Sequence, residues 1–308
     1  MSGSEGKTLP FGYQFLAGAV AGVCEISIMY PLDVVKTRFQ QQSATASSNG
    51  AHYTGVINCF KRIISEEGIC TLYRGIVAPI AVEAPKRAMK FATQKEFTKL
   101  VRNTLSDRPG DHAQLISIIS GTLTGVTEAC LVSSFELVKI RMQDKANHSL
   151  YKNTGDCVRK IWKTEGPLSF LRGIESACWR NGSWNGAYFG MIHTIRSNLP
   201  QHVNKPTASE EAMRNFLAGT IGGILATTVN TPFDVVKTRI QSYIPTSSNI
   251  TRIYTYKWAW SGVFYIARTE GIKGLYRGFL PKVLRLGPGG GILLVVFDIV
   301  SNALKKYV

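Results

Sequence analysis

Long, mostly apolar segments alternate with shorter polar ones along the chain. Three segments of helical length carry few charges and have glycines one turn apart: residues 11–39, 115–142 and 216–240. Each precedes a polar loop, a short basic amphipathic segment such as residues 56–67, and a second segment of helical length. These second segments are residues 76–101, 174–199 and 279–305. Since strand signals are sparse, the pattern predicts an all-α protein with two long helices and a short one per unit.

The same motifs return at matched offsets, which indicates an internal repeat. PLDVVKTRFQ at residues 31–40 is matched by SFELVKIRMQ at 134–143 and by PFDVVKTRIQ at 232–241. A second motif follows each time, as EGICTLYRG (67–75), EGPLSFLRG (165–173) and EGIKGLYRG (270–278). We therefore predict three repeats of about 100 residues, with the boundaries 1–108, 109–206 and 207–308.

The charge of the chain leaves two classes of protein open. Among 308 residues there are 36 Lys and Arg against 20 Asp and Glu, a formal net charge of +16. This suits a nucleic-acid-binding protein or a membrane protein with basic loops on one side. Many basic residues recur at repeat-equivalent positions and no nucleic-acid-binding motif is present, which favours a membrane protein without a nucleic-acid partner. Six amphipathic spans around a water-filled interior would explain a mean hydropathy near zero.

Signatures of enzymes and metal sites are missing from the sequence. It contains no nucleophile–base motif and no phosphate-binding GxxxxGK[ST] loop, and its six cysteines form no CxxC pair or cluster with histidine. We therefore expect no enzymatic activity, catalytic residue, metal or cofactor. The N-terminus has neither the apolar core of a signal peptide nor an arginine-rich transit pattern, so no cleaved presequence is expected.

Each first motif places an acid three residues before a base. The pairs are Asp33/Lys36, Glu136/Lys139 and Asp234/Lys237. Pairing within one helix would contribute only about 0.2–0.5 kcal/mol. Three pseudosymmetric copies can instead close a ring between helices that plugs a cavity: Asp33 to Lys139, Glu136 to Lys237 and Asp234 to Lys36. Glutamines able to hydrogen-bond across these pairs follow at the same offset, as Gln40, Gln143 and Gln241.

With Px[DE]xxKxRxQ three times in register, each followed by [DE]G…RG, the sequence resembles the mitochondrial carrier family over essentially its whole length. The resemblance implies six membrane-spanning helices in the inner mitochondrial membrane, threefold pseudosymmetry and transport by alternating access. It makes the charged pairs a gate on the matrix side, braced by the glutamines, and sets both termini in the intermembrane space. A monomer would suffice. Ser134 departs from the proline pattern, so a softer kink is expected there.

The RG elements suggest a lipid site. A glycine precedes each second long helix, whose N-terminus offers free backbone N–H groups to phosphate, and an arginine stands beside it. The residues are Arg74, Gly75, Arg172, Gly173, Arg277 and Gly278. The resemblance implies that these elements bind cardiolipin. A plain glycine turn before a helix is an equally economical interpretation from the sequence alone.

The resemblance also implies substrate contacts seven residues after each RG glycine. The residues there are Val82 with Glu83, Arg180 with Asn181, and Arg285. Helical spacing adds further residues to the same faces, namely Lys86, Lys90, Trp184 and Tyr188. An arginine grips a carboxylate bidentately and a lysine supplies a point charge, so a dicarboxylate is expected to bridge the two arginines. For Lys86 and Arg87 a structural role is the alternative, since Glu83 can simply neutralise one of them.

Three strings narrow the substrate class: EAPKRAMKFAT (83–93), RNGSWNGAYFG (180–190) and LPKVLRLGPGGGI (280–292). They are most similar to the branch of the family that carries 2-oxodicarboxylates. The resemblance thus implies antiport of 2-oxoadipate and 2-oxoglutarate. An organic-anion carrier of the same family, for citrate or for malate and oxoglutarate, stays open as the alternative.

The family also has a second gate, on the cytoplasmic side, and this sequence departs from its pattern. The positions that hold acids in the family contain Lys95, His193 and Asp298, and those that hold bases contain Thr98, Arg196 and Ser301. Since only Asp298 keeps an acid, we expect a weak cytoplasmic network and an empty carrier that favours the state closed on the matrix side.

Overall fold

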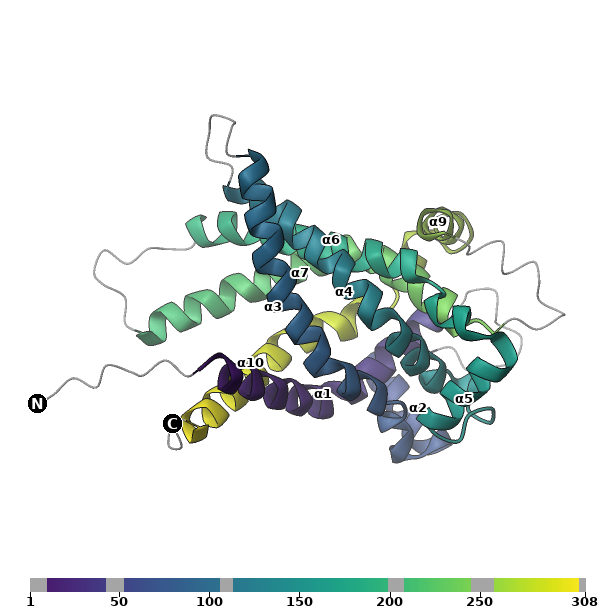
Figure 1. Ribbon diagram of the computed structural model, residues 1–308. Helices are drawn as coiled ribbons and strands as arrows, with labels where there is room; N and C mark the ends of the chain where they lie inside the picture. The colour runs from purple at the N-terminus through teal and green to yellow at the C-terminus, as the bar shows by residue number, and fades with distance from the viewer. Residues whose placement is uncertain (1–9, 43–52, 106–112, 199–207, 245–257, 305–308) are drawn as a thin grey trace, which may run out of the picture.

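The computed structural model describes residues 10–42, 53–105, 113–198, 208–244 and 258–304 (Figure 1). Within these ranges the chain is helical and contains no strand, which confirms the all-α prediction. The long helices are α1 (Phe11–Gln41), α3 (Val77–Leu105), α4 (Ala113–Gln143), α6 (Ile174–Asn198), α7 (Ala208–Ser242) and α10 (Phe279–Leu304). Most bounds lie close to the predicted ones, but α7 begins well before residue 216.

A short helix follows the first, third and fifth of these long helices, which are α1, α4 and α7. We call these three the odd helices, and α3, α6 and α10 the even helices. The short helices are α2 (Val56–Glu67), α5 (Thr154–Glu165) and α9 (Ala259–Leu275), with the 3-10 turns η2 (Ile69–Tyr73), η3 (Lys145–Asn147) and η4 (Pro167–Leu171). The glycine of each EG motif has a positive φ: 87° at Gly68, 81° at Gly166 and 72° at Gly271. Only glycine adopts this conformation readily, so the motif sets the bend after α2 and after α5 and a kink within α9 at Gly271.

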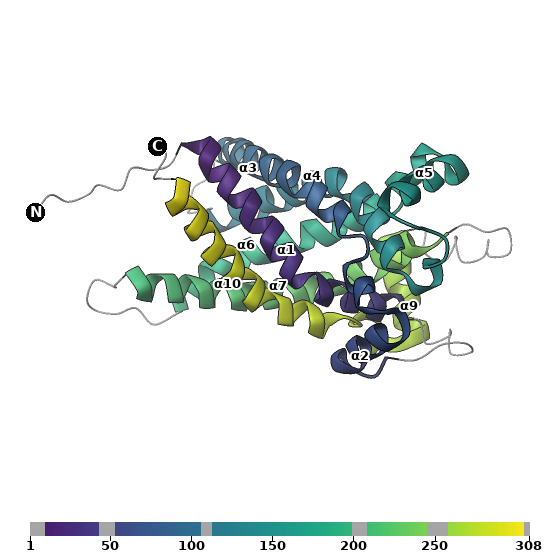
Figure 2. The same cartoon turned by 90° about the horizontal axis from the view of Figure 1, so that it is seen from below.

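The six long helices form a closed ring. Each contacts the next one along the chain, and α10 returns to contact α1 (Figures 1 and 2). The start of α1 and the end of α10 lie at one end of this barrel, and α2, α5 and α9 lie at the other. At the end with the short helices, α1, α4 and α7 also contact one another, so the odd helices converge there. We call this the closed end.

The barrel is polar inside and apolar outside. Asp234, Lys237 and Glu83 are buried, whereas Val295 and Ile299 are exposed by 59% and 63%. Three of the long helices are apolar and long enough to cross a membrane: Gly12–Gln41, Ala113–Gln143 and Phe279–Leu304. A buried polar interior with an apolar surface suits a protein that faces lipid and encloses water.

A glycine allows α4 and α6 to pack closely beside the barrel interior. A Cβ atom at Gly125 would lie 2.6 Å from the carbonyl oxygen of Asn181, so the two backbones are nearly in contact. This is the role expected of small residues one turn apart where lipid surrounds the helices. It also fixes the position of Asn181 at the cavity wall.

Candidate substrate site and ion-pair ring

At the closed end, α1, α4 and α7 are joined by the three ion pairs that the repeat symmetry predicts. Lys139 Nζ lies 2.7 Å from Asp33 Oδ2, and Lys36 Nζ lies 2.7 Å from Asp234 Oδ2. Lys237 binds Glu136 and completes the set. These six residues are called the ion-pair ring below. The pairs run between helices, so the alternative of pairing within each helix does not apply.

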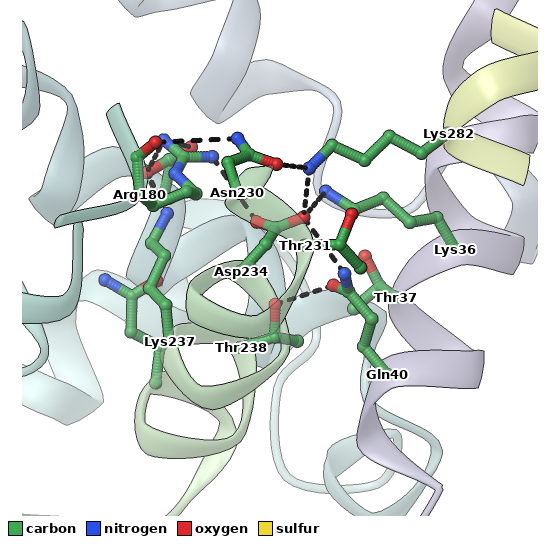
Figure 3. A network of polar contacts seen from close by, with 12 residues as sticks. Lys36, Thr37, Gln40, Arg180, Asn230, Thr231, Asp234, Lys237, Thr238 and Lys282 are labelled. Carbon is green, nitrogen blue, oxygen red and sulfur yellow. Dashed lines mark hydrogen bonds and ion pairs between the residues drawn. The ribbon is translucent and has the colours of Figure 1, made fainter. Parts of the chain in front are cut away.

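The ring is not symmetric in its bonding, because Asp234 has more partners than Asp33 or Glu136 (Figure 3). We call Asp234 the hub of the ring. Its carboxylate accepts a hydrogen bond from Gln40 Nε2 at 3.0 Å in addition to the ion pair with Lys36. Lys282 Nζ lies 3.1 Å from Asp234 Oδ2, and Arg180 Nη1 lies 3.6 Å from Oδ1. The side chain of Asp234 is only 2% exposed, so these donors replace its water.

The expected glutamine braces are found in one repeat. Gln40 donates to Asp234 and accepts a hydrogen bond from Thr238 at 2.8 Å. Gln241 instead donates to Ser133 Oγ at 3.2 Å and to the carbonyl of Arg172, so the expectation is wrong there. Within the described ranges Gln143 has no hydrogen bond to a ring residue either. Ser133 offers Gln241 both a hydroxyl and a carbonyl oxygen, which draws its amide away from the ring.

Both predicted substrate arginines contact acids of the ring. Arg285 Nη1 lies 2.7 Å from Asp33 Oδ1, and its Nη2 lies 2.8 Å from Glu25 Oε1. Arg180 Nη2 lies 2.9 Å from Glu136 Oε1, besides the longer contact with Asp234. Each arginine therefore has carboxylate partners inside the protein. The sequence contained both groups, but the motif spacing did not predict their contact.

On α3, Glu83 is buried and binds two cations of its own helix. Lys86 Nζ lies 2.6 Å from Glu83 Oε2, and Arg87 Nε lies 2.7 Å from Glu83 Oε1. Both cations are therefore paired, but one carboxylate balances only one of them, and the cluster of Glu83, Lys86 and Arg87 keeps a net positive charge. Val82, next to Glu83, is buried and lines the barrel interior.

Three adjoining cavities occupy the barrel interior, and we call them together the central cavity. Their volumes are about 140, 410 and 270 Å³, and they share lining residues such as Arg180, Arg285 and Lys86. Seven basic and five acidic side chains line them, so basic groups outnumber acidic ones in the lining. An excess of positive charge attracts an anion.

Most of the remaining predicted contacts line this space. Lys90, Asn181 and Trp184 border the cavity of about 270 Å³. Tyr188 stacks on Trp184, with ring centroids 5.0 Å apart and ring planes 5° apart, and is not among the residues that line the three cavities. The Tyr188 ring thus packs directly against a residue of the cavity wall.

The RG arginines join neighbouring repeats. Arg74 donates to the carbonyl of His148 at 2.7 Å, Arg172 donates to the carbonyl of Tyr243 at 3.3 Å, and Arg277 donates to the carbonyl of Gln42. Gly75, Gly173 and Gly278 have φ values of 82°, 76° and 81°, as tight turns before helices require. The arginine side chains are thus committed to protein groups, which agrees with the turn interpretation.

A second threefold set of ion pairs was missed by the sequence reasoning. The arginine of each first motif binds the glutamate of the following EG motif: Arg38 with Glu67 at 2.6 Å, Arg141 with Glu165, and Arg239 with Glu270 at 2.6 Å. All six residues recur at equivalent positions of the repeats, and this recurrence is the feature of the sequence that could have predicted the pairs.

At the opposite end of the barrel, the described side chains form no ion pair between any two of the even helices α3, α6 and α10. Thr98 Oγ1 donates to the carbonyl of Gln94 in its own helix at 2.7 Å, and Ser301 is buried. The side chains of His193 and Arg196 lie outside the described part of the chain.

Comparison with known proteins places the chain in a family. The profile of the family described as "mitochondrial carrier protein" matches residues 7–105, 111–203 and 208–308. The chain therefore belongs to the mitochondrial carrier family, and it is a mitochondrial membrane transporter rather than an enzyme.

Three curated relatives illustrate the similarity. The chain is 50% identical to the mitochondrial citrate transporter D of Aspergillus niger, over 97% of this chain and 96% of the relative. It is 47% identical to the mitochondrial 2-oxodicarboxylate carrier 2 of Saccharomyces cerevisiae, over 99% and 97%. It is 39% identical to the mitochondrial 2-oxodicarboxylate carrier of Mus musculus, over 92% of each.

Proposed function

We propose that this protein is an antiporter that exchanges 2-oxodicarboxylates, with 2-oxoadipate and 2-oxoglutarate as substrates, across the inner mitochondrial membrane. The observation that carries the proposal is the position of Arg180 on α6 and Arg285 on α10, which border the same cavity. Two arginines on different helices suit the two carboxylates of one substrate. The names of the yeast and mouse relatives support this substrate class.

The contacts of the two arginines suggest how binding is coupled to opening. Arg285 is bound to Asp33 and Glu25, and Arg180 is bound to Glu136. A substrate carboxylate competes with these acids for the same guanidinium groups. Binding thereby removes a partner from two acids of the ring, which weakens the closed end. The central cavity then opens toward the matrix, and exchange of equally charged substrates is electroneutral.

Citrate is the second candidate substrate. The Aspergillus niger relative is named as a citrate transporter and shares half of its residues with this chain. A tricarboxylate needs a third cation, and Lys90 lines the cavity without an ion-pair partner among the described residues. The two arginines that border one cavity match two carboxylates, which favours a dicarboxylate over citrate.

Uptake by the purified protein in liposomes tests the proposal. Liposomes loaded with 2-oxoglutarate are offered labelled 2-oxoadipate, 2-oxoglutarate, malate, citrate or ADP. We expect rapid uptake of the two 2-oxodicarboxylates, slower uptake of malate and citrate, and none of ADP. Uptake of citrate above that of both 2-oxodicarboxylates would favour the second candidate, and exchange of ADP alone would overturn both.

For the surroundings of the protein, we propose that the closed end faces the matrix and that both chain termini lie in the intermembrane space. Lysines and arginines at the closed end, such as Lys61, Arg159 and Arg268 on the short helices, support this orientation. We also propose that cardiolipin binds at the starts of α3, α6 and α10. Since the RG arginines are occupied, and the N–H groups of Ile76 and Phe279 bond within the preceding turn, the donors for its phosphates are the next backbone N–H groups in the first turns of these helices. The three repeats form one transport unit, and a monomer suffices.

Thermal unfolding in detergent tests the lipid contact. Added cardiolipin is expected to raise the unfolding temperature more than phosphatidylglycerol, which has a single phosphate. An equal effect of both lipids would indicate a general effect of anionic lipid.

A further inference from the structure

Two polar residues that face each other in the barrel interior exist only in the third repeat. Lys282 on α10 lies four residues after Gly278, and the equivalent positions of the other repeats hold Pro79 and Ala177. Asn230 on α7 lies two residues before Pro232, where the other repeats hold Met29 and Val132. The threefold scheme of gate and helix packing therefore does not account for this pair.

The two residues bind each other and the hub of the ring (Figure 3). Lys282 Nζ donates to Asn230 Oδ1 and to Asp234 Oδ2, the latter at 3.1 Å. Asn230 Nδ2 in turn donates to the carbonyl of Arg180 at 3.5 Å, which fixes the amide so that its oxygen meets the lysine. An ammonium group has three N–H donors, so one donor of Lys282 is left over.

The position of Lys282 makes that donor available to a substrate. Lys282 lines the cavity of about 410 Å³ together with Arg180 and Arg285, and it also lines the neighbouring cavity of about 270 Å³. Its charge is in excess as well, because Asp234 is already paired with Lys36 at 2.7 Å. A second ammonium group on one buried carboxylate is costly unless a further acceptor joins it.

We infer that Lys282, oriented by Asn230, recognises the 2-oxo group of the substrate. This inference rests on the proposed function. Arg180 and Arg285 bind carboxylates, and a plain dicarboxylate offers the same two groups. The oxo oxygen lies next to one carboxylate, so a donor adjacent to Arg180 reaches it when that carboxylate is bound. A substrate with two unlike ends also needs a site without threefold symmetry, which the Lys282–Asn230 pair provides.

Transport of 2-oxoglutarate and glutarate, which differ only in the oxo group, tests the inference. Initial uptake rates of both are measured for the wild-type protein and for Lys282→Met in liposomes. We expect the wild type to prefer 2-oxoglutarate and the variant to lower the ratio of the two rates by about tenfold, as loss of a charge-assisted hydrogen bond implies. Lys90→Met is the matched control, because it removes a lysine of the same cavity; we expect it to slow both substrates equally.

Asn230→Val, which introduces the residue type of the second repeat, should lower the same ratio in the same direction. It carries the test if Lys282→Met does not fold, as judged by thermal unfolding in detergent. An unchanged ratio in the folded variants, or a wild type without preference, would overturn the inference. So would a loss of preference in Asn181→Ala that Lys282→Met does not share. Absence of all dicarboxylate uptake by the wild type would instead refute the proposed function.

Discussion

Arg285 Nη1 on α10 lies 2.7 Å from Asp33 Oδ1 on α1, and the same carboxylate also binds Lys139 of the ion-pair ring. The Asp33 carboxylate therefore binds both a candidate substrate-binding arginine and a lysine of the ring. Arg180 and Glu136 repeat this relationship at 2.9 Å. The substrate site and the closed end of the barrel are thus a single network of charges, and most of our predictions concern that network.

Removal of either arginine should stop transport. We expect Arg180→Ala and Arg285→Ala each to reduce dicarboxylate uptake by roughly 100-fold, because a charged hydrogen-bond partner of the substrate is lost. Insertion into the membrane should persist, as measured by resistance to alkaline extraction. Arg62→Ala, which removes an exposed partner of Glu66 on α2, is the control and should retain uptake. Normal uptake by either cavity variant would contradict the assignment.

Exchanging the charges of one ring pair should fail to restore function. In an isolated ion pair, Asp33→Lys combined with Lys139→Asp recreates the bond. Here Asp33→Lys also sets an ammonium group against Arg285, so we expect the double variant to remain as inactive in uptake as either single variant. Recovery of wild-type uptake in the double variant would mean that Arg285 does not depend on Asp33 during transport.

Thiol labelling can show which end of the empty carrier is shut. We expect Lys90→Cys, in the central cavity, to react with a membrane-impermeant reagent added outside mitochondria that lack their outer membrane. Ser65→Cys, exposed on α2 at the closed end, should not react from that side. Excess 2-oxoglutarate should slow the first reaction. Protection of Lys90→Cys in the absence of substrate would indicate a resting state that is shut at the other end.

Two native cysteines should be inert in such experiments. Burial raises the pKa of Cys59 on α2 and of Cys157 on α5 to about 12. A raised pKa keeps the thiol protonated, so at pH 7–8 almost no reactive thiolate is present, and reactivity should rise only as the pH approaches 12. Mass spectrometry after maleimide treatment should find both unmodified in the folded protein and modified after denaturation. Modification of either in the folded protein at neutral pH would contradict the packing.

The second set of ion pairs should govern stability more than transport chemistry. Arg141 is fully buried and binds Glu165, so Glu165→Gln leaves a buried guanidinium without its anion. Breaking such a pair costs about 3–5 kcal/mol, and a large fall in the unfolding temperature is expected. Glu66→Gln, at an exposed pair, should change it little. Similar unfolding temperatures for both variants would contradict the importance of burial.

The helices and the ring could be predicted from the sequence because threefold repetition fixes which acid meets which base. The pairs Asp33–Lys139 and Asp234–Lys36 follow from symmetry alone once three helices are assumed to converge. The same reasoning fails where symmetry is broken. Gln241 turns toward Ser133, and nothing in its motif distinguishes it from Gln40.

Contacts between long side chains of different helices are harder to predict from the sequence. Arg285 reaches the ring because α10 packs against α1, and motif spacing does not encode which side chains meet between these helices. Lys282 has no counterpart in the other repeats, so threefold repetition does not single it out. Lys282 and Asn230 are instead distinguished in the sequence as polar residues at positions that are apolar in the sister repeats.

The unequal bonding of the three ring acids has a mechanical consequence. The contact between α7 and α1 combines the Asp234–Lys36 pair with hydrogen bonds from Gln40 to Asp234 and from Thr238 to Gln40. The contact between α4 and α7 combines the Lys237–Glu136 pair with hydrogen bonds from Gln241 to Ser133 and from Arg141 to the carbonyl of Gln241. Among the described residues, the contact between α1 and α4 has the Lys139–Asp33 pair and a long hydrogen bond, from Gln41 to the carbonyl of Ile140 at 3.4 Å. The barrel is therefore expected to part first between α1 and α4 and to turn about α7, which stays bound to both of its neighbours.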